Sequence, residues 1–401
     1  METESTKENP PPPSPPEGGS LSLIEDDFPG RMQRAMRLMP ENHMGLGRRA
    51  LFFAAITWLP IMLWALWKHR VTDGVDEPLL AHFGIHVRFL LALPLMILGE
   101  GWLHRTSQRV LSQFRTSGIV PDGEKERFEA IVGSFAGLRK KWWPWLLLVV
   151  VPLIWSFVGP TMQRFHELKW AEEAGVAHSF GFGGFWYRFV ARPIFALFVG
   201  LWFWRLVLLF VFLWKVSKLD LDLVPTHPDH AAGLGFLSGI PKGFSLFILA
   251  VSSVVASQLA HDIIYHGARI AELKSIAGTF VVLITVLCLG PLLVFAGKLR
   301  VTRREGLAMY GKLIGEHGRQ FRIRWILGQD PPRPEMLEAP EMGATCDTFQ
   351  IYDAVKQINP LPLNKHAVAA VVLPAVLPML AVAALQMPIQ DILLKLAGAL
   401  F

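Results

Sequence analysis

Charge and cysteine are both scarce in this sequence, and each shortage excludes a class of protein. Of the 401 residues, 18% are charged and 52% are hydrophobic, and the mean hydropathy is +0.37. Soluble domains carry roughly 25% charged residues, so the composition argues against a soluble globular protein. The two cysteines, Cys288 in an apolar run and Cys346 in a polar one, provide neither a disulfide framework nor a thiolate metal site.

The start of the chain also has no secretory signal. Its first residues, METESTKENPPPPSPPEGGS, contain neither the basic region nor the apolar region of a signal peptide. The polar, Pro-rich composition predicts a disordered tail at 1–30, followed by a juxtamembrane segment at 31–50. An internal span is therefore expected to direct insertion. HExxH and GxSxG are missing as well, which argues against the common intramembrane metalloprotease and serine hydrolase chemistries.

Long apolar runs are abundant. A helix needs about 20 residues to cross the hydrocarbon core of a membrane. Seven runs approach or exceed this length: Leu51–Trp67, Ile85–Leu103, Trp142–Pro160, Phe189–Trp214, Gly243–Ala260, Ala277–Gly297 and His366–Gln386. The predicted fold is an all-α, multi-pass transmembrane helix bundle of about seven spans with short cytoplasmic helices.

This pattern divides the chain into parts. The first six spans form a membrane bundle at 51–297, which is interrupted by a cytoplasmic loop at 104–141. A cytoplasmic helical loop follows at 298–365, and then the seventh span (366–386) with a C-terminal tail whose residues 389–401 are expected at the membrane interface. The apolar stripes within the two loops, such as Phe128, Ile131 and Phe135, predict helices. No internal repeat is evident.

Basic residues predict the orientation and the partners. The segments 1–50, 104–141, 215–242 and 298–365 hold 28 Lys and Arg, whereas the alternate segments 68–84, 161–188, 261–276 and 387–401 hold 8. This asymmetry predicts a cytoplasmic N-terminus and a C-terminus on the opposite side of the membrane. Clusters such as Arg48-Arg49 and Arg303-Arg304 are expected to contact anionic lipid, so membrane lipids rather than nucleic acid are the predicted partners.

The segment LDLVPTHPDHAAGLGFLSG, residues 221–239, combines two histidines, two aspartates and three glycines between apolar runs. Thr226 and Asp229 fit the [ST]-x-x-[DE] pattern of a capping box, which predicts that a helix begins at Thr226. Gly233 and Gly235 would allow close backbone packing. The segment HPDHAAGLGFL resembles that of an uncharacterised group of bacterial multi-pass inner-membrane proteins with an HPDxAGGLGFL-like segment, in which Ala232 stands where a glycine is expected. The resemblance implies a multi-pass protein of the bacterial inner membrane, and hence a periplasmic C-terminus, but it implies no activity.

Other interpretations of this segment remain open. His227, Asp229 and His230 form one group of possible metal ligands, and His261, Asp262 and His266 form another. The fifth span separates the two groups by about 25–30 Å, and each alone offers too few ligands for a closed tetrahedral site. A phosphate or a lipid headgroup could bind at a helix beginning near Thr226. Capping and interfacial hydrogen bonding are favoured, and neither a metal nor a cofactor is predicted.

Two charged residues lie inside predicted spans. Ionisable side chains at bilayer depth are costly and are commonly functional. Arg205 is the deepest, and Glu100 lies three residues from the end of the second span. Arg205 either extends to the headgroups or faces the bundle and pairs with Glu100. We expect it to face the interior, beside Glu100 or backbone carbonyls freed by proline.

These residues favour a transporter or channel-like protein of unknown substrate, with Arg205 and Glu100 in the pathway and the 226–239 turn as a gate. One alternative is a membrane sensor or scaffold that acts through its cytoplasmic helices. Another is a membrane-embedded enzyme acting on a lipid-type substrate, with His227, Asp229 and His230 as acid, base or metal ligands.

Overall fold

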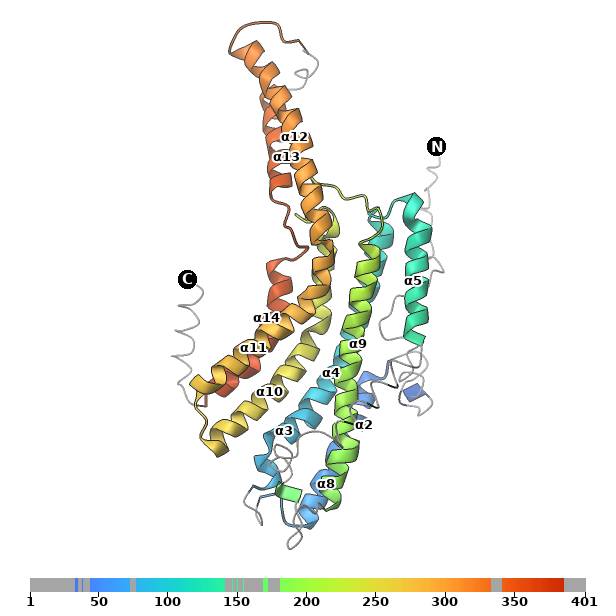
Figure 1. Ribbon diagram of the computed structural model, residues 1–401, viewed down its shortest axis with the longest axis vertical. Helices are drawn as coiled ribbons and strands as arrows, with labels where there is room; N and C mark the ends of the chain where they lie inside the picture. The colour runs from blue at the N-terminus through green and yellow to red at the C-terminus, as the bar shows by residue number, and fades with distance from the viewer. Residues whose placement is uncertain are drawn as a thin grey trace, which may run out of the picture.

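The chain folds into helices throughout the part that the structure describes. The computed structural model describes residues 33–34, 38, 44–72, 77–140, 146, 150, 154, 169–171, 181–332 and 341–385. Over these residues every regular element is a helix (Figure 1). The predicted tail at 1–30 and the residues 386–401 lie outside this part.

Six helical stretches are long and apolar enough to cross a membrane: Leu46–Trp67, Phe83–Thr116, Phe182–Val216, Leu234–Tyr265, Lys274–Trp325 and Lys365–Ala383. They correspond to six of the seven predicted spans. The remaining one, Trp142–Pro160, lies almost entirely outside the described residues. The protein is an all-α, multi-pass transmembrane helix bundle.

The elements follow one another in a simple order. The membrane part contains α2 (Leu46–Trp67), α3 (Phe83–His86), η2 (Val87–Ala92), α4 (Leu93–Thr116), α8 (Phe182–Trp186), η5 (Tyr187–Ala191), α9 (Arg192–Val216), η6 (Leu234–Phe244), α10 (Ser245–His266), α11 (Ile270–Leu289), η7 (Gly290–Phe295) and α14 (Lys365–Ala383). Shorter 3-10 turns lie at η1 (Leu79–Ala81), η3 (Asp122–Glu124) and η4 (Lys169–Ala171), and α5 (Lys125–Lys140), α12 (Ala296–Trp325) and α13 (Glu341–Lys356) complete the set.

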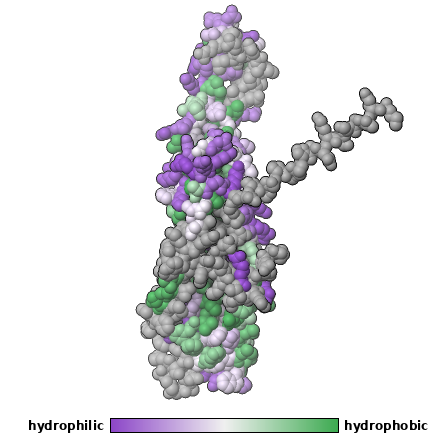
Figure 2. Space-filling view, turned by 90° about the vertical axis from the view of Figure 1, so that its right-hand side faces the viewer, coloured by the Kyte–Doolittle hydropathy of each residue, from purple (hydrophilic) through white to green (hydrophobic). Residues whose placement is uncertain are grey.

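The outer surface of the spans is apolar, as a lipid-facing surface must be. Leu63, Leu283 and Leu377, on three different spans, are 62%, 65% and 62% exposed. A soluble protein rarely exposes so much contiguous apolar surface. In Figure 2, hydrophobic residues gather on the lower part of the molecule and hydrophilic residues on the upper part.

α4 lies at the centre of the packing. It contacts α2, α9, α10 and η6. α10 also packs against α14, where the hydroxyl of Ser252 on α10 donates to the carbonyl of Ala375 on α14 at 2.5 Å. Residues on α4 are therefore the most deeply enclosed positions available for a functional side chain.

Two spans begin in the same way. α3 leads through the π-helix η2 into α4, and α8 leads through the π-helix η5 into α9. Pro94 and Pro193 are the second residues of the α-helices that follow, and a residue without an N–H removes one i→i−4 bond at the junction. The side chain of Arg88 donates to the hydroxyl of Tyr187 at 2.5 Å and joins the two segments. This repeat of local structure was not evident from the sequence.

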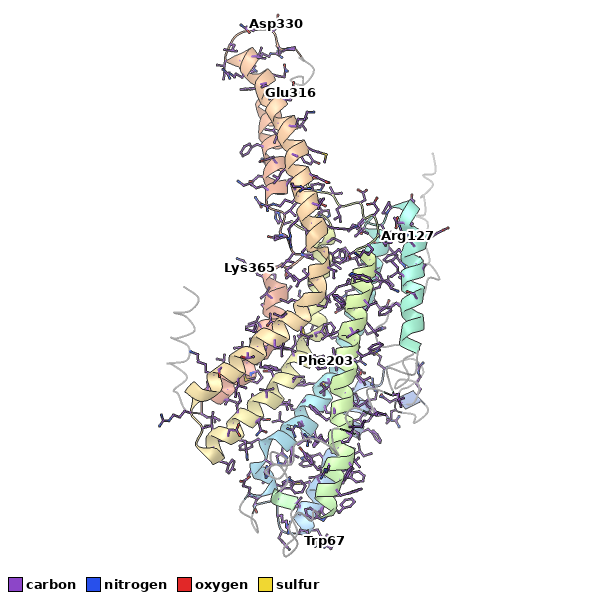
Figure 3. All side chains as sticks on the ribbon, viewed as in Figure 1. Trp67, Arg127, Phe203, Glu316, Asp330 and Lys365 are labelled. Atoms are coloured by element: carbon purple, nitrogen blue, oxygen red, sulfur yellow. The ribbon has the colours of Figure 1, made fainter. Side chains whose placement is uncertain are left out.

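The two predicted loop helices are present at the same end of the bundle. α5 packs its apolar stripe inward, with Phe128, Val132 and Phe135 buried. The sixth predicted span continues through η7 into α12, which extends beyond the bundle beside α13 (Figure 1). We call α12 and α13 together the arm. In Figure 3, Glu316 and Asp330 mark the arm and its tip, and Trp67 marks the opposite end of the bundle.

Candidate functional site

The predicted pairing of Arg205 with Glu100 is confirmed. Nη2 of Arg205 lies 2.7 Å from Oε1 of Glu100, and the two side chains are 3% and 1% exposed. A third residue joins them, because Nη2 of Arg49 lies 2.6 Å from the other carboxylate oxygen. We call these three residues the charge cluster. They come from three different spans: Arg49 from α2, Glu100 from α4 and Arg205 from α9.

Glycines on both sides of Glu100 allow the neighbouring helices to approach. A Cβ at Gly99 would lie 3.0 Å from the ring of Trp202 on α9, and a Cβ at Gly101 would lie 2.5 Å from Cδ1 of Leu46 on α2. Each glycine thus allows close approach of the span that carries one of the arginines. The short sequence Gly-Glu-Gly therefore builds the cluster, since it places a carboxylate between two close helix contacts.

Aromatic rings hold Arg205 in place. Its guanidinium carbon lies 5.2 Å from the ring centroid of Trp202, one turn earlier on α9, within the range of a cation–π contact. Trp202 in turn stacks on Phe247 of α10, with centroids 5.0 Å apart and planes 8° apart. Figure 3 labels Phe203, two residues before Arg205, and so marks the level of the cluster on α9.

Arg49 occupies an unfavourable position that Glu100 compensates. It lies in the first turn of α2, where the helix dipole places a partial positive charge. The sequence pattern predicts lipid contact for both Arg48 and Arg49. That assignment is wrong for Arg49, which is buried against Glu100, while its neighbour Arg48 is exposed. Helical geometry gives consecutive residues directions about 100° apart, so the two arginines point differently.

Over the residues that the structure describes, the charge cluster has two guanidinium groups and one carboxylate, which sum to a charge of +1. A buried charge is costly unless it is balanced by an opposite one. Nε and Nη1 of Arg49 are buried and make no hydrogen bond within the described part of the chain. The indole Nε1 of Trp202 is also buried and makes no hydrogen bond to any described residue. The arrangement therefore presents hydrogen-bond donors and positive charge, which are the properties that bind an anion.

A small cavity adjoins the charge cluster. Its lining includes Leu103 of α4 and Leu209 of α9, each one turn beyond a cluster residue. Thr106 and Ser107 contribute hydroxyl groups to a wall that is otherwise apolar. The cavity holds about 20 Å³, which is room for roughly one water molecule. Because its wall is mostly apolar, the void is a packing gap beside the cluster and admits nothing larger than water.

The predicted capping box at Thr226 is wrong. No helix begins there, because the next helical element is the 3-10 helix η6 at Leu234. The Asp229 carboxylate points forward instead of back to Thr226. It accepts from the backbone N–H of Ala231, Gly233 and Gly235 at 2.9, 3.1 and 2.7 Å. The loop wraps around its own carboxylate, which takes the place that a bound phosphate would occupy in such a ring of N–H groups.

These hydrogen bonds control the ionisation of Asp229. Partial burial acts to raise the pKa of this carboxyl, but the three backbone donors and the His227 ring together lower it below its usual value. Nδ1 of His227 lies 2.9 Å from Oδ1 of Asp229. Because backbone donors engage both oxygens of Asp229, the aspartate is poorly suited to act with His227 and His230 as a metal ligand or a general base.

The loop around Asp229 requires left-handed backbone conformations. His230, Ala232 and Gly233 have φ of 53°, 53° and 96°. Glycine adopts this region without steric cost, whereas an alanine is strained there. Glycine at position 232 would therefore remove the strain that Ala232 carries. Gly235 is required for a second reason, since a Cβ there would lie 2.7 Å from Cβ of Asp229.

The same loop joins the membrane bundle to the arm. The backbone N–H of Asn359, just after α13, donates to the carbonyl of His230 at 2.8 Å. Gly306 of α12 packs on Pro225, where a Cβ would lie 2.9 Å from the proline ring. The predicted functional turn therefore also connects the bundle to the arm.

A second group of side chains converges at the other end of the bundle. Glu77, His82 and His261 are buried, and one ligand atom from each lies within 4.8 Å of the other two. His261 was proposed from the sequence together with Asp262 and His266. Asp262 instead contacts Gln258 at 3.4 Å, and the side chain of His266 lies outside the described part. Glu77 and His82 were not predicted, because only the fold brings them to His261.

Comparisons with known proteins add no further information on the site. No family model, curated protein or solved structure matches this chain. The function has to be argued from the geometry of the chain itself.

Proposed function

We propose that this integral membrane protein is a transport protein for a small anion, and that the charge cluster is its binding site. One observation carries the proposal. Three ionisable side chains from three spans meet in the bundle, and their charges sum to +1 rather than zero. A purely structural ion pair needs only one arginine for Glu100, so the second arginine supports a role beyond helix association.

The chemistry of the cluster suggests how an anion is handled. A guanidinium group binds carboxylate, phosphate or smaller anions through several N–H donors. An anion that binds Arg49 neutralises the net charge and competes with Glu100 for this arginine. Release from Glu100 would loosen the contact between α2 and α4, so occupancy is coupled to helix packing.

We further propose that the chain lies in a bacterial inner membrane with its N-terminus in the cytoplasm and its C-terminus in the periplasm, in contact with anionic lipids. The basic asymmetry of the loops supports this orientation, and the resemblance of the HPDH segment supports a bacterial membrane. α5 and the arm lie at one end of the bundle, as alternation of the spans requires (Figure 1). A phosphatase fused after Phe401 should be active in the periplasm; activity of a cytoplasmic reporter there would reverse the assignment.

Anion flux in proteoliposomes tests the transport function. The purified full-length chain is reconstituted, and efflux of chloride, acetate and phosphate is measured under an imposed gradient. Wild type should release at least one of these anions faster than empty liposomes. Arg49→Gln should reduce that flux at least about tenfold, because a lost charged hydrogen bond costs about 1.5–3 kcal/mol.

Arg48→Gln is the matched control. It removes the same charge one residue away, from an exposed side chain, and should transport as wild type does. If both variants transport equally, or if wild type transports none of the three anions, the assignment of the cluster as an anion pathway is wrong.

The arm favours a second candidate, a membrane sensor or scaffold. α12 and α13 extend beyond the bundle, and the loop around Asp229 connects them to it (Figure 1). Deletion of residues 307–356 would distinguish the candidates. A transporter should retain flux without the arm, whereas a scaffold should lose its biological effect while the bundle remains folded. The enzyme alternative is not proposed, because the oxygens of Asp229 are held by backbone N–H groups.

A further inference from the structure

Glu77, His82 and His261 come from two separate parts of the chain. Glu77 and His82 flank the single turn η1 in the connection between α2 and α3, and His261 lies in the last part of α10. All three residues are buried. Two imidazoles and a carboxylate with converging ligand atoms are the composition of known zinc sites.

The spacing fits a shared ion better than direct hydrogen bonds. Nε2 of His82 lies 3.8 Å from Oε2 of Glu77, and Nε2 of His261 lies 3.9 Å from the same oxygen. Hydrogen bonds between such atoms would be about 2.7–3.2 Å long. Two ligands of one tetrahedral zinc ion, each bonded at about 2.0–2.2 Å, lie about 3.4 Å apart. The present spacing needs only a small inward movement to reach that value.

His261 is oriented as metal-binding histidines are. Its Nδ1 lies 3.1 Å from the carbonyl oxygen of Ala81. Because a carbonyl only accepts, Nδ1 carries the hydrogen, and in the neutral ring Nε2 then has the lone pair that faces Glu77. A backbone carbonyl that fixes the tautomer in this way is the usual outer partner of a histidine ligand. The ring of His82 stacks on that of His261, with centroids 5.4 Å apart.

The segment that carries Glu77 and His82 is held independently of any ion. The N–H of Leu79 donates to the carbonyl of Arg70 at 3.0 Å. Nε2 of His86 lies 3.1 Å from the carbonyl oxygen of Leu79, and the indole of Trp58 donates to the other nitrogen of His86 at 3.0 Å. These contacts fix the turn against α2, so the ligands are already close together before metal binding.

From this geometry we propose that Glu77, His82 and His261 bind one divalent transition-metal ion of the zinc type, which clamps the connection between α2 and α3 onto the end of α10. Two nitrogen ligands argue against calcium and magnesium, which prefer oxygen. Three protein ligands leave one coordination position for water or another ligand. The site lies about 27 Å along the helix from Glu100 at 1.5 Å per residue, so it does not depend on the anion proposal.

Zinc binding to the full-length chain tests the site. Detergent-purified protein is stripped with a chelator and titrated with Zn²⁺ against a chromophoric competitor. Wild type should bind one ion per chain. Glu77→Gln, His82→Gln and His261→Gln should each weaken binding at least about 100-fold, since loss of even an outer partner commonly costs 10–100-fold. Asp262→Asn and the exposed-site change His69→Asn should bind as wild type does.

A second measurement covers variants that fail to fold. Co²⁺ added to stripped wild type should give the visible absorption bands of a low-symmetry cobalt site, and Zn²⁺ should displace them. Absence of a stoichiometric ion in the titration, absence of the cobalt bands, or an equal loss of binding in Asp262→Asn would each overturn the proposal. Zinc affinity is measured without any flux, so failure of the metal site and failure of the transport function are distinguishable.

Discussion

Replacing Glu100 by glutamine is the most informative perturbation of the charge cluster. The amide keeps the shape of the side chain but removes its charge, so both buried guanidinium groups lose the carboxylate that they contact. In the structure each arginine lies within 2.7 Å of the carboxylate and is about 3% exposed. Breaking a buried ion pair by removing one partner costs about 3–5 kcal/mol. We therefore expect Glu100→Gln to lower the free energy of unfolding by that amount.

The change can be followed by tryptophan fluorescence, because the chain has 14 tryptophans. Unfolding is titrated with a denaturing detergent in mixed micelles. Glu129→Gln is the control, since Glu129 makes a bidentate pair with Arg115 at 2.8 Å but is largely exposed. An exposed pair contributes only about 0–1 kcal/mol. The double variant Glu100→Gln with Arg205→Gln should be more stable than additivity predicts, by about 0.5–3 kcal/mol.

Equal stability of Glu100→Gln and Glu129→Gln would refute this reasoning. It would mean that water or lipid headgroups screen the cluster, and that the arginines do not need the carboxylate. A strictly additive double variant would show that Glu100 and Arg205 are not energetically coupled despite their contact.

The loop around Asp229 yields the remaining predictions. Ala232→Gly should increase the free energy of unfolding by about 0.5–1 kcal/mol, and so raise the thermal midpoint, because φ is 53° at this position. Gly235→Ala should lower the free energy of unfolding by about 1–3 kcal/mol, since the new Cβ would lie 2.7 Å from Cβ of Asp229. Folding lowers the pKa of Asp229 from its usual 3.8. Ionisation of Asp229 therefore stabilises the fold above that pH, and this stabilisation is lost as the pH falls through the folded-state pKa. The stability difference between wild type and Asp229→Asn, from denaturant unfolding at several pH values, should therefore shrink below about pH 4; a constant difference would contradict this.

The sequence predicts spans well because membrane crossing depends on length and hydropathy, which are local properties. The pairing of Arg205 with Glu100 was also predictable, since two opposite charges in neighbouring spans have few other partners. Arg49 was missed because adjacent arginines at the end of a span have the composition of a lipid contact. The glycines on both sides of Glu100 were a usable signal, as they indicate that two helices approach this position.

Other features depended on information that the sequence pattern does not carry. Thr226 and Asp229 match a capping box, but the pattern does not say whether the carboxylate turns back or forward. Left-handed backbone at His230 and Ala232 turns the following N–H groups toward it. The convergence of His82 with His261 follows from packing of α3 against α10, and no local spacing predicts it.

The central claim, that the buried net charge binds an anion, is tested most directly by ligand-induced stabilisation. The melting temperature of the purified chain is measured against increasing chloride, acetate and phosphate at constant ionic strength, for wild type, Arg49→Gln and Arg48→Gln. The account predicts a saturable rise with at least one anion for wild type and Arg48→Gln, and no rise for Arg49→Gln, whose cluster is already neutral. An identical response of all three proteins would contradict it.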